Sequence, residues 1–279
     1  MSLLVVGALH LDVVLRAPHL PGLDETVTGS AVDYVFGGKG GNQAVAAARL
    51  GAKVEFAGRT GVDGFGAALR ATLTESGVET RQLQDDPGPS GMSAAIVDAQ
   101  GEYGAVIVSA ANLNIDAARI HVPEGTALVL LQNEIPEEVN LTVARSARAA
   151  GARVWLNAGP ARPLPPALTD ALDLLIVNRV EAAAYSDLAV PKLETRGADG
   201  VMFEDTLAPG YAVDVISTHG AGDVFVGALA ADVTRGVRIA DAIPFAQAAA
   251  ALHVSMPTEA RAQLSRTAVT AFLQDHSSR

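Results

Sequence analysis

The segment STHGAGDVFVGALAA (residues 217–231) places Gly220, Ala221 and Gly222 directly before Asp223 and an apolar stretch. We expect a helix over about residues 221–235, preceded by a strand near residues 211–216. Small residues at a helix start let a ligand approach backbone N–H groups that have no partner within the helix, so such a segment can bind an anion. A carboxylate fits there if Asp223 takes a proton from an attacking hydroxyl while phosphoryl charge develops beside it. The alternative is an acid that only stabilises the helix dipole.

A second cluster, FGGKGGNQAVAAARLGA (residues 36–52), holds four glycines around Lys39 and runs into a helix near Asn42. Neither the spacing to the lysine nor the residue after it matches a Walker phosphate loop. A flexible backbone with a paired lysine and asparagine suits a polyhydroxyl ligand. The alternative is a turn in which Asn42 caps the helix.

A third segment, NRVEAAAY (residues 178–185), follows an apolar strand and places Asn178 and Glu181 three positions apart at a helix start. The pair can provide a phosphate or magnesium environment through water, because Mg²⁺ keeps much of its hydration shell. The alternative is an N-cap asparagine followed by a helix-start acid.

Short apolar runs of strand length alternate with alanine-rich stretches of helical length. The runs lie at residues 3–9, 53–58, 127–132, 153–158 and 172–178, and the helical stretches at 42–51, 65–77 and 137–151. This alternation predicts an α/β fold, a three-layer α/β/α arrangement around a mostly parallel sheet. Residues 12–36 and 92–109 read as β-structure without helices, the second as a hairpin around Gln100 and Gly101, so we expect a small separate sheet. No linker divides the chain, which favours a single domain over residues 1–279.

The composition indicates which kinds of molecule the protein binds. Twenty basic against 31 acidic residues give a net charge of −11, which argues against nucleic acid or an anionic membrane and favours a small ligand. The chain has no cysteine, its apolar runs are too short to span a bilayer, and its first residues do not resemble a signal peptide. We therefore expect a cytoplasmic protein.

Taken together, the motifs resemble those of the ribokinase-like carbohydrate kinases of the phosphofructokinase-B type, over nearly the whole chain. The matching segments, in the family's order, are GGKGGNQAVAAARLGA, NRVE, TRGADG (residues 195–200) and HGAGDVFVGAL. The resemblance implies the family's fold with a small β-sheet lid, here about residues 12–36 and 92–109, that closes over the site and often forms a dimer surface. It also implies transfer of the γ-phosphoryl group of ATP, with Mg²⁺, to a hydroxyl of a small sugar or a nucleoside.

The resemblance also implies roles for individual residues. Asp223 is similar to the catalytic base, and the N–H groups of Gly220, Ala221 and Gly222 to the anion hole. The positions that fall at the sugar are His10, Asp12, Gly38, Lys39, Asn42 and Glu134. Asn178 and Glu181 resemble the phosphate and magnesium positions, and Thr195 and Gly197 the nucleotide contacts. His219 and Gln247 fall beside the expected adenine pocket, although a surface histidine and a helix glutamine fit those positions equally well.

Three features depart from the family pattern. Ser217 replaces an aspartate that helps relatives to hold a monovalent cation, and residues 254–266 lack the usual glycine-containing loop, so we predict weak or absent potassium activation. His10 replaces an asparagine near the sugar, so the sugar need not be ribose; a half-buried histidine satisfied by a neighbour fits equally well. A helix is missing after Tyr185, which predicts partly exposed apolar residues on one sheet face or their cover by another subunit.

Two other functional classes remain open. A nucleoside kinase would use the same scaffold, and a non-catalytic sugar or nucleotide sensor could keep the fold, although the intact Gly220 to Asp223 segment argues against a sensor. A dinucleotide-dependent oxidoreductase is more remote, because no glycine fingerprint follows the first strand.

Overall fold

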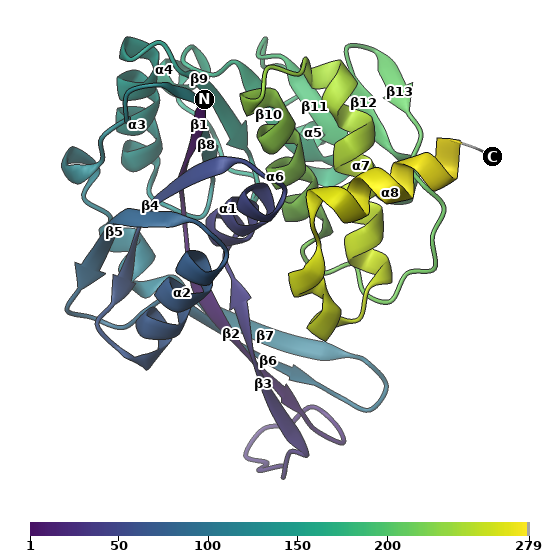
Figure 1. Cartoon of the computed structure of the whole chain (residues 1–279). Coiled ribbons are helices and arrows are strands. Elements are labelled where there is room, and N and C mark those ends of the chain that lie inside the picture. The colour runs from purple at the N-terminus through teal and green to yellow at the C-terminus, as the bar shows by residue number, and fades with distance from the viewer. Residues whose placement is uncertain (278–279) are drawn as a thin grey trace.

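The computed structural model describes residues 1–277, within which a nine-stranded sheet forms the centre of the molecule (Figure 1). Its strands are β1 (Ser2–Val6), β4 (Lys53–Gly61), β5 (Glu79–Asp86), β8 (Thr126–Gln132), β9 (Arg153–Asn157), β10 (Leu174–Asn178), β11 (Lys192–Thr195), β12 (Val201–Phe203) and β13 (Thr206–Ala208). The order is β13-β12-β11-β10-β9-β8-β1-β4-β5, with parallel pairing from β5 to β11 and antiparallel pairing at β12 and β13. The predicted mostly parallel sheet is confirmed.

Helices cover both faces of this sheet. One core cluster combines α1 (Lys39–Arg49), α2 (Gly64–Glu75), α6 (Ala221–Thr234), α7 (Ile239–Ser255) and α8 (Arg266–Ser277). The other combines α3 (Glu137–Ala149), α4 (Pro166–Thr169) and α5 (Arg179–Ala184). Along β1, Leu3 and Val5 belong to the first cluster and Leu4 and Val6 to the second, because successive side chains of a strand point to opposite faces. The three-layer α/β/α prediction is confirmed.

A small mixed sheet projects from this body (Figure 1). It consists of β2 (His10–Arg16), β3 (Ala31–Gly37), β6 (Met92–Val97) and β7 (Tyr103–Val108), in the order β3-β2-β6-β7. Strands β6 and β7 form the predicted hairpin, in which Gly101 has a φ of 85°. Because β1 leads into β2 and β3 leads into α1, the base of this lid sheet lies next to the starts of the central helices.

Helices α1 and α6 approach closely at Gly227. A Cβ atom on this glycine would lie 2.6 Å from the carbonyl oxygen of Gln43 and 2.7 Å from the Cβ of Ala46. The missing side chain therefore fixes the separation of the two helices whose first turns carry Asn42 and Asp223.

The expected strand near residues 211–216 is wrong: this segment forms no sheet ladder. The sheet ends at the short strand β13, and the chain then leaves it to line a cavity with Tyr211, Val213 and Val215. The apolar side chains of this segment line the cavity rather than a neighbouring strand. The amides of Ile216 and Ser217 both donate to the carbonyl of Val254, at 2.8 and 3.2 Å.

The segment after Tyr185 is short, and apolar residues in it are partly exposed, as predicted. Helix α5 spans only residues 179–184, and Leu188 and Val190, which follow it, are half-buried against the second core cluster. Within residues 1–277, no helix combines the length and the apolar character that a membrane span requires.

Candidate active site

Asp223 lies in the first turn of α6, after Gly220, the N-cap residue. Gly220 has a φ of 77°, which glycine adopts without strain. The Asp223 side chain is buried; its Oδ1 accepts a hydrogen bond from Gln43 Nε2 at 2.9 Å, and its Oδ2 accepts one from Asn42 Nδ2 at 3.1 Å. Burial raises the pKa of Asp223, while Lys39 and the two amides act in the opposite direction.

The backbone amides around this carboxylate are partly unpaired. Among the described residues, the N–H groups of Gly220, Gly222 and Asp223 have no acceptor, whereas the N–H of Ala221 donates to the carbonyl of Thr218 at 3.2 Å. A Cβ on Gly222 would meet nothing within 4 Å, so open space adjoins this amide. Two of the three predicted anion-hole amides are therefore free, and the third is used in a turn.

Gln43, which the sequence motifs did not single out, is the centre of a buried amide network. Its Nε2 donates to Asn157 Oδ1 at 3.0 Å as well as to Asp223, and its Oε1 accepts from Gln132 Nε2 at 2.9 Å. The only signal in the sequence was its place beside Asn42 within an alanine-rich helix. The network fixes the position of the carboxylate through side chains of α1 and β8.

The predicted sugar positions form a polar group at the start of α1. The backbone N–H of Lys39 donates to Glu134 Oε2 at 2.7 Å, and burial raises the pKa of Glu134 to about 6. Asp12 Oδ1 accepts a hydrogen bond from Ser93 Oγ at 2.5 Å. Gly38, with a φ of 88°, is the N-cap of α1, which begins at Lys39, so Asn42 lies within the first turn and is not the cap.

His10 lies at the start of β2 and is buried. Its Nε2 lies 3.4 Å from Asn112 Nδ2, and burial lowers its pKa. Asn112 also accepts from the backbone N–H of Leu9 and donates to its carbonyl, at 2.9 and 2.8 Å. His10 therefore has a neighbouring polar partner, as expected if it is a buried histidine that is satisfied by a neighbour rather than a sugar ligand.

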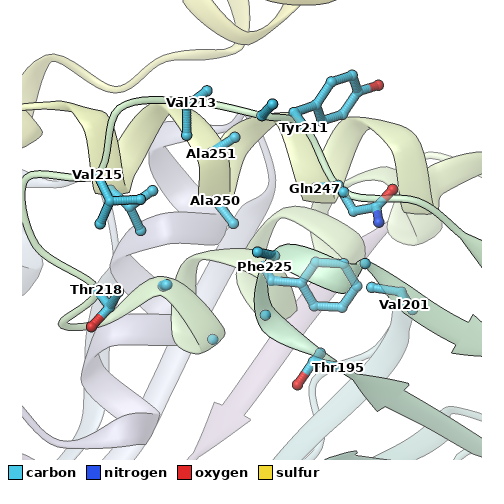
Figure 2. Close-up of a pocket in the computed structure, with 18 residues that line it drawn as sticks. Thr195, Val201, Tyr211, Val213, Val215, Thr218, Phe225, Gln247, Ala250 and Ala251 are labelled. Carbon is cyan, nitrogen blue, oxygen red and sulfur yellow. The ribbon is translucent and has the colours of Figure 1, made fainter.

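A cavity of about 490 Å³ opens on the other side of the α6 start (Figure 2). Its walls combine the apolar residues Val201, Phe225 and Ala250 with backbone at Ala221 and Gly222. Three predicted nucleotide residues also line it, namely Thr195, Gly197 and Gln247. An apolar slot that ends at a helix start with the unpaired amide of Gly222 matches the shape and chemistry of a base attached to phosphates.

Asn178 and Glu181 form a capping box at α5. Asn178 Oδ1 accepts from the amides of Val180 and Glu181 at 2.9 and 2.8 Å, and Glu181 Oε2 accepts from the amide of Asn178 at 2.9 Å. The other carboxylate oxygen, Oε1, faces Gly159, where a Cβ would lie 2.5 Å from it and 3.2 Å from Lys39 Cε. Within the described residues no group of three or more acidic or histidine side chains could hold a metal directly, so this single free oxygen fits Mg²⁺ only through water and substrate phosphates.

His219 does not line the cavity beside which it was expected, because the turn at Thr218 and Gly220 carries it to the opposite side. It lines a smaller cavity of about 240 Å³ together with Asn42 and Gly220. Its carbonyl oxygen lies 2.9 Å from His253 Nε2.

Comparisons with known proteins agree with this architecture. The model of the pfkB family carbohydrate kinases matches residues 1–262. The ribokinase of Bacillus subtilis (strain 168) is 34% identical over 271 residues, which cover 91% of this chain and 92% of that protein. The crystal structure of ribokinase from Thermotoga maritima has a TM-score of 0.88 at 26% identity and covers 98% of this chain and 99% of that one. Arabidopsis thaliana ribokinase complexed with ribose and ATP has a TM-score of 0.87 at 28% identity, with 98% of both chains covered. The chain therefore belongs to the pfkB family of carbohydrate kinases, enzymes that transfer a phosphoryl group to a sugar hydroxyl.

Proposed function

We propose that this kinase, a single domain over residues 1–279, transfers the γ-phosphoryl group of ATP to a hydroxyl of a small sugar, with Asp223 as the general base. One observation carries the proposal: a buried carboxylate, held by Asn42 and Gln43, belongs to the residue directly after Gly222, and the amides of Gly220 and Gly222 at this helix start are unpaired. A structural helix-start acid would need neither the two amide partners nor the open space at Gly222.

The residues around the carboxylate support each part of this chemistry. The raised pKa of Asp223 makes it a stronger base than an exposed aspartate, and Lys39 keeps the charged form available. The amides of Gly220 and Gly222 would take up the negative charge of the migrating phosphoryl group. Because phosphoryl transfer has a loose transition state, positioning contributes more than basicity.

The polar group formed by Asp12, Lys39 and Glu134 would bind the sugar hydroxyls, with the backbone of Gly38 and the amide of Asn42. Ribose is the first candidate because the relatives that cover most of the chain are ribokinases. His10 stands where the family pattern has an asparagine near the sugar. Sugars related to ribose are therefore also candidate substrates. The polar surroundings favour a free sugar over a nucleoside, whose base would need an apolar wall.

ATP would occupy the larger cavity, with Thr195, Gly197 and Gln247 around the nucleoside and Ala221 and Gly222 at the phosphates. Asn178 and Glu181 would hold Mg²⁺ through water. When bound, the ion supplies positive charge beside the phosphoryl oxygens.

The small sheet would act as a lid that keeps water from the phosphoryl group and would also pair two copies of the chain. Its strand β7 is exposed along its whole length, and it carries Val106 and Ile107, each 67% exposed. We place this dimer on the lid because a strand that exposes large apolar side chains is a feature of interaction surfaces.

The experiment that tests the function measures ADP formation over a panel of pentoses, hexoses and nucleosides. We expect ribose or a close analogue to give the highest kcat/KM, and Asp223→Asn to lower kcat by about 10²- to 10⁴-fold with little change in KM. Asp241→Asn is the matched control, because Asp241 is also an acid in the first turn of a helix, α7, but is exposed and paired with Arg238.

Equal activity of Asp223→Asn and the wild type would remove Asp223 from its proposed role. Sugar binding by calorimetry without ADP formation from any substrate would instead support the sensor. Preference for a nucleoside would support the nucleoside kinase.

A further inference from the structure

The loop that leads into α6 is held from outside by Arg261. This residue lies in the 3-10 helix η4 (Thr258–Gln263). Its two terminal nitrogens donate to two loop carbonyls, Nη2 to Ser217 at 2.9 Å and Nη1 to His219 at 3.3 Å. The next residue along the loop is Gly220, the N-cap of α6.

The charge of Arg261 is not neutralised by an acid. Among the described residues, no carboxylate lies within ion-pair distance of it, and its buried Nε has no hydrogen-bond partner. Its surroundings are basic or neutral, because His219, His253 and Arg49 line the same small cavity. Partial burial lowers the pKa of Arg261, but a guanidinium stays protonated at every physiological pH.

Backbone carbonyl oxygens are also the groups with which proteins bind free monovalent ions. Here the carbonyls of Ser217 and His219 contact a covalently attached cation, and the His219 carbonyl also lies 2.9 Å from His253 Nε2. The Ser217 side chain offers no compensating charge, since its Oγ is neutral and lies 3.4 Å from the amide of His219, which donates to it. The observed contacts of these two carbonyls therefore include a fixed cation, the Arg261 guanidinium.

We propose that Arg261 is a positioning residue that supplies a fixed positive charge behind the free amides of Gly220 and Gly222 and replaces an activating monovalent cation. This inference rests on the proposed kinase function, in which those amides receive phosphoryl charge. By holding the carbonyls of Ser217 and His219, the guanidinium fixes the loop, and its field favours negative charge at the helix start.

The test compares the wild type, Arg261→Ala, Arg261→Lys and the control Arg238→Ala, with choline, Na⁺, K⁺ or guanidinium as the cation. Arg238 is an exposed arginine at the opposite end of α7 from His253 and has its own partner, Asp241. We expect wild-type kcat to change less than twofold among the salts. Arg261→Ala should lose about 10- to 100-fold in kcat with little change in the KM of the sugar, and should recover in part with guanidinium or K⁺. The kcat of Arg261→Lys should lie between those of the wild type and Arg261→Ala, because one ammonium cannot span both carbonyls.

A stimulation of the wild type by K⁺ above about tenfold would overturn the proposal, as would an Arg261→Ala variant with wild-type kcat. A variant that loses activity, melts at the wild-type temperature and is not rescued by any cation would also contradict it.

Calorimetric binding of a non-hydrolysable ATP analogue separates this inference from the proposed function. If no panel substrate is phosphorylated, the kinase assignment fails, but the analogue still tests Arg261. Weaker binding to Arg261→Ala that K⁺ restores would support the fixed charge, and equal binding would reject it.

Discussion

The fold raises the pKa of the Glu134 carboxyl towards neutral pH. Burial raises its pKa from 4.5 to about 6, against the effect of the Lys39 amide and charge. Since the folded state binds this proton more tightly than the unfolded chain, the contribution of Glu134 to stability is complete below about pH 4.5 and is lost as the pH rises through about 6.

Glu134→Gln should remove that dependence, because glutamine does not titrate. We expect the free energy of unfolding of the wild type, relative to the variant, to fall by about 1 to 2 kcal/mol between pH 4.5 and pH 7. Urea denaturation at both pH values measures this difference, and Glu138→Gln on the exposed face of α3 is the control. A wild-type and variant difference that stays constant over this range would show that the carboxyl is not buried in solution.

At the same scale, the residues chosen from the sequence lie together in the structure, their roles stay predictions, and the sequence missed their partners. Asp223, Asn42, Lys39 and Glu134 come together as the family pattern implies. Gln43 and Arg261 were not found, because a glutamine in an alanine-rich helix and an arginine in a polar segment have no local signal of what they contact. Their roles depend on residues far away in the chain.

At the scale of elements, the contact of α1 with α6 determines how the site is assembled. Gly227→Ala should push the helices apart, since its Cβ would lie 2.6 Å from the carbonyl oxygen of Gln43. We expect a loss of about 1 to 3 kcal/mol in the free energy of unfolding and a lower kcat, because Asn42 and Gln43 would move relative to Asp223.

Urea denaturation and turnover measure both effects of that substitution. Gly64→Ala in the first turn of α2 is the matched control, because a Cβ there meets nothing within 4 Å. Wild-type stability of Gly227→Ala would mean that the two helices pack less closely than described.

Most of the helices and strands could be predicted from the sequence. Continuous apolar runs predicted the central strands because both sheet faces are covered, and the glycines after the first three predicted helices, Gly51, Gly77 and Gly151, all have positive φ. Residues 211–216, which were predicted to form a strand that leads into α6, pair with no strand and instead line the cavity. Apolar side chains in a sequence cannot by themselves distinguish a sheet core from a cavity wall.

At the scale of the whole molecule, the projecting lid predicts self-association. If two lids pair through β7, Ile107→Lys should convert a dimer into a monomer, because a charge would enter the apolar contact. Sedimentation velocity measures the change. Leu207→Lys on β13, at the far edge of the main sheet, is the control for a new surface lysine. A wild-type monomer at high concentration would exclude this arrangement.

The larger cavity has one more consequence for the kinase. Among the described residues its lining comes wholly from positions 195–254, whereas the lid is built from positions 10–37 and 92–108. If ATP binds there and the lid closes over the sugar, nucleotide could leave and enter without the lid opening. We would then expect the sugar and ATP to bind in either order.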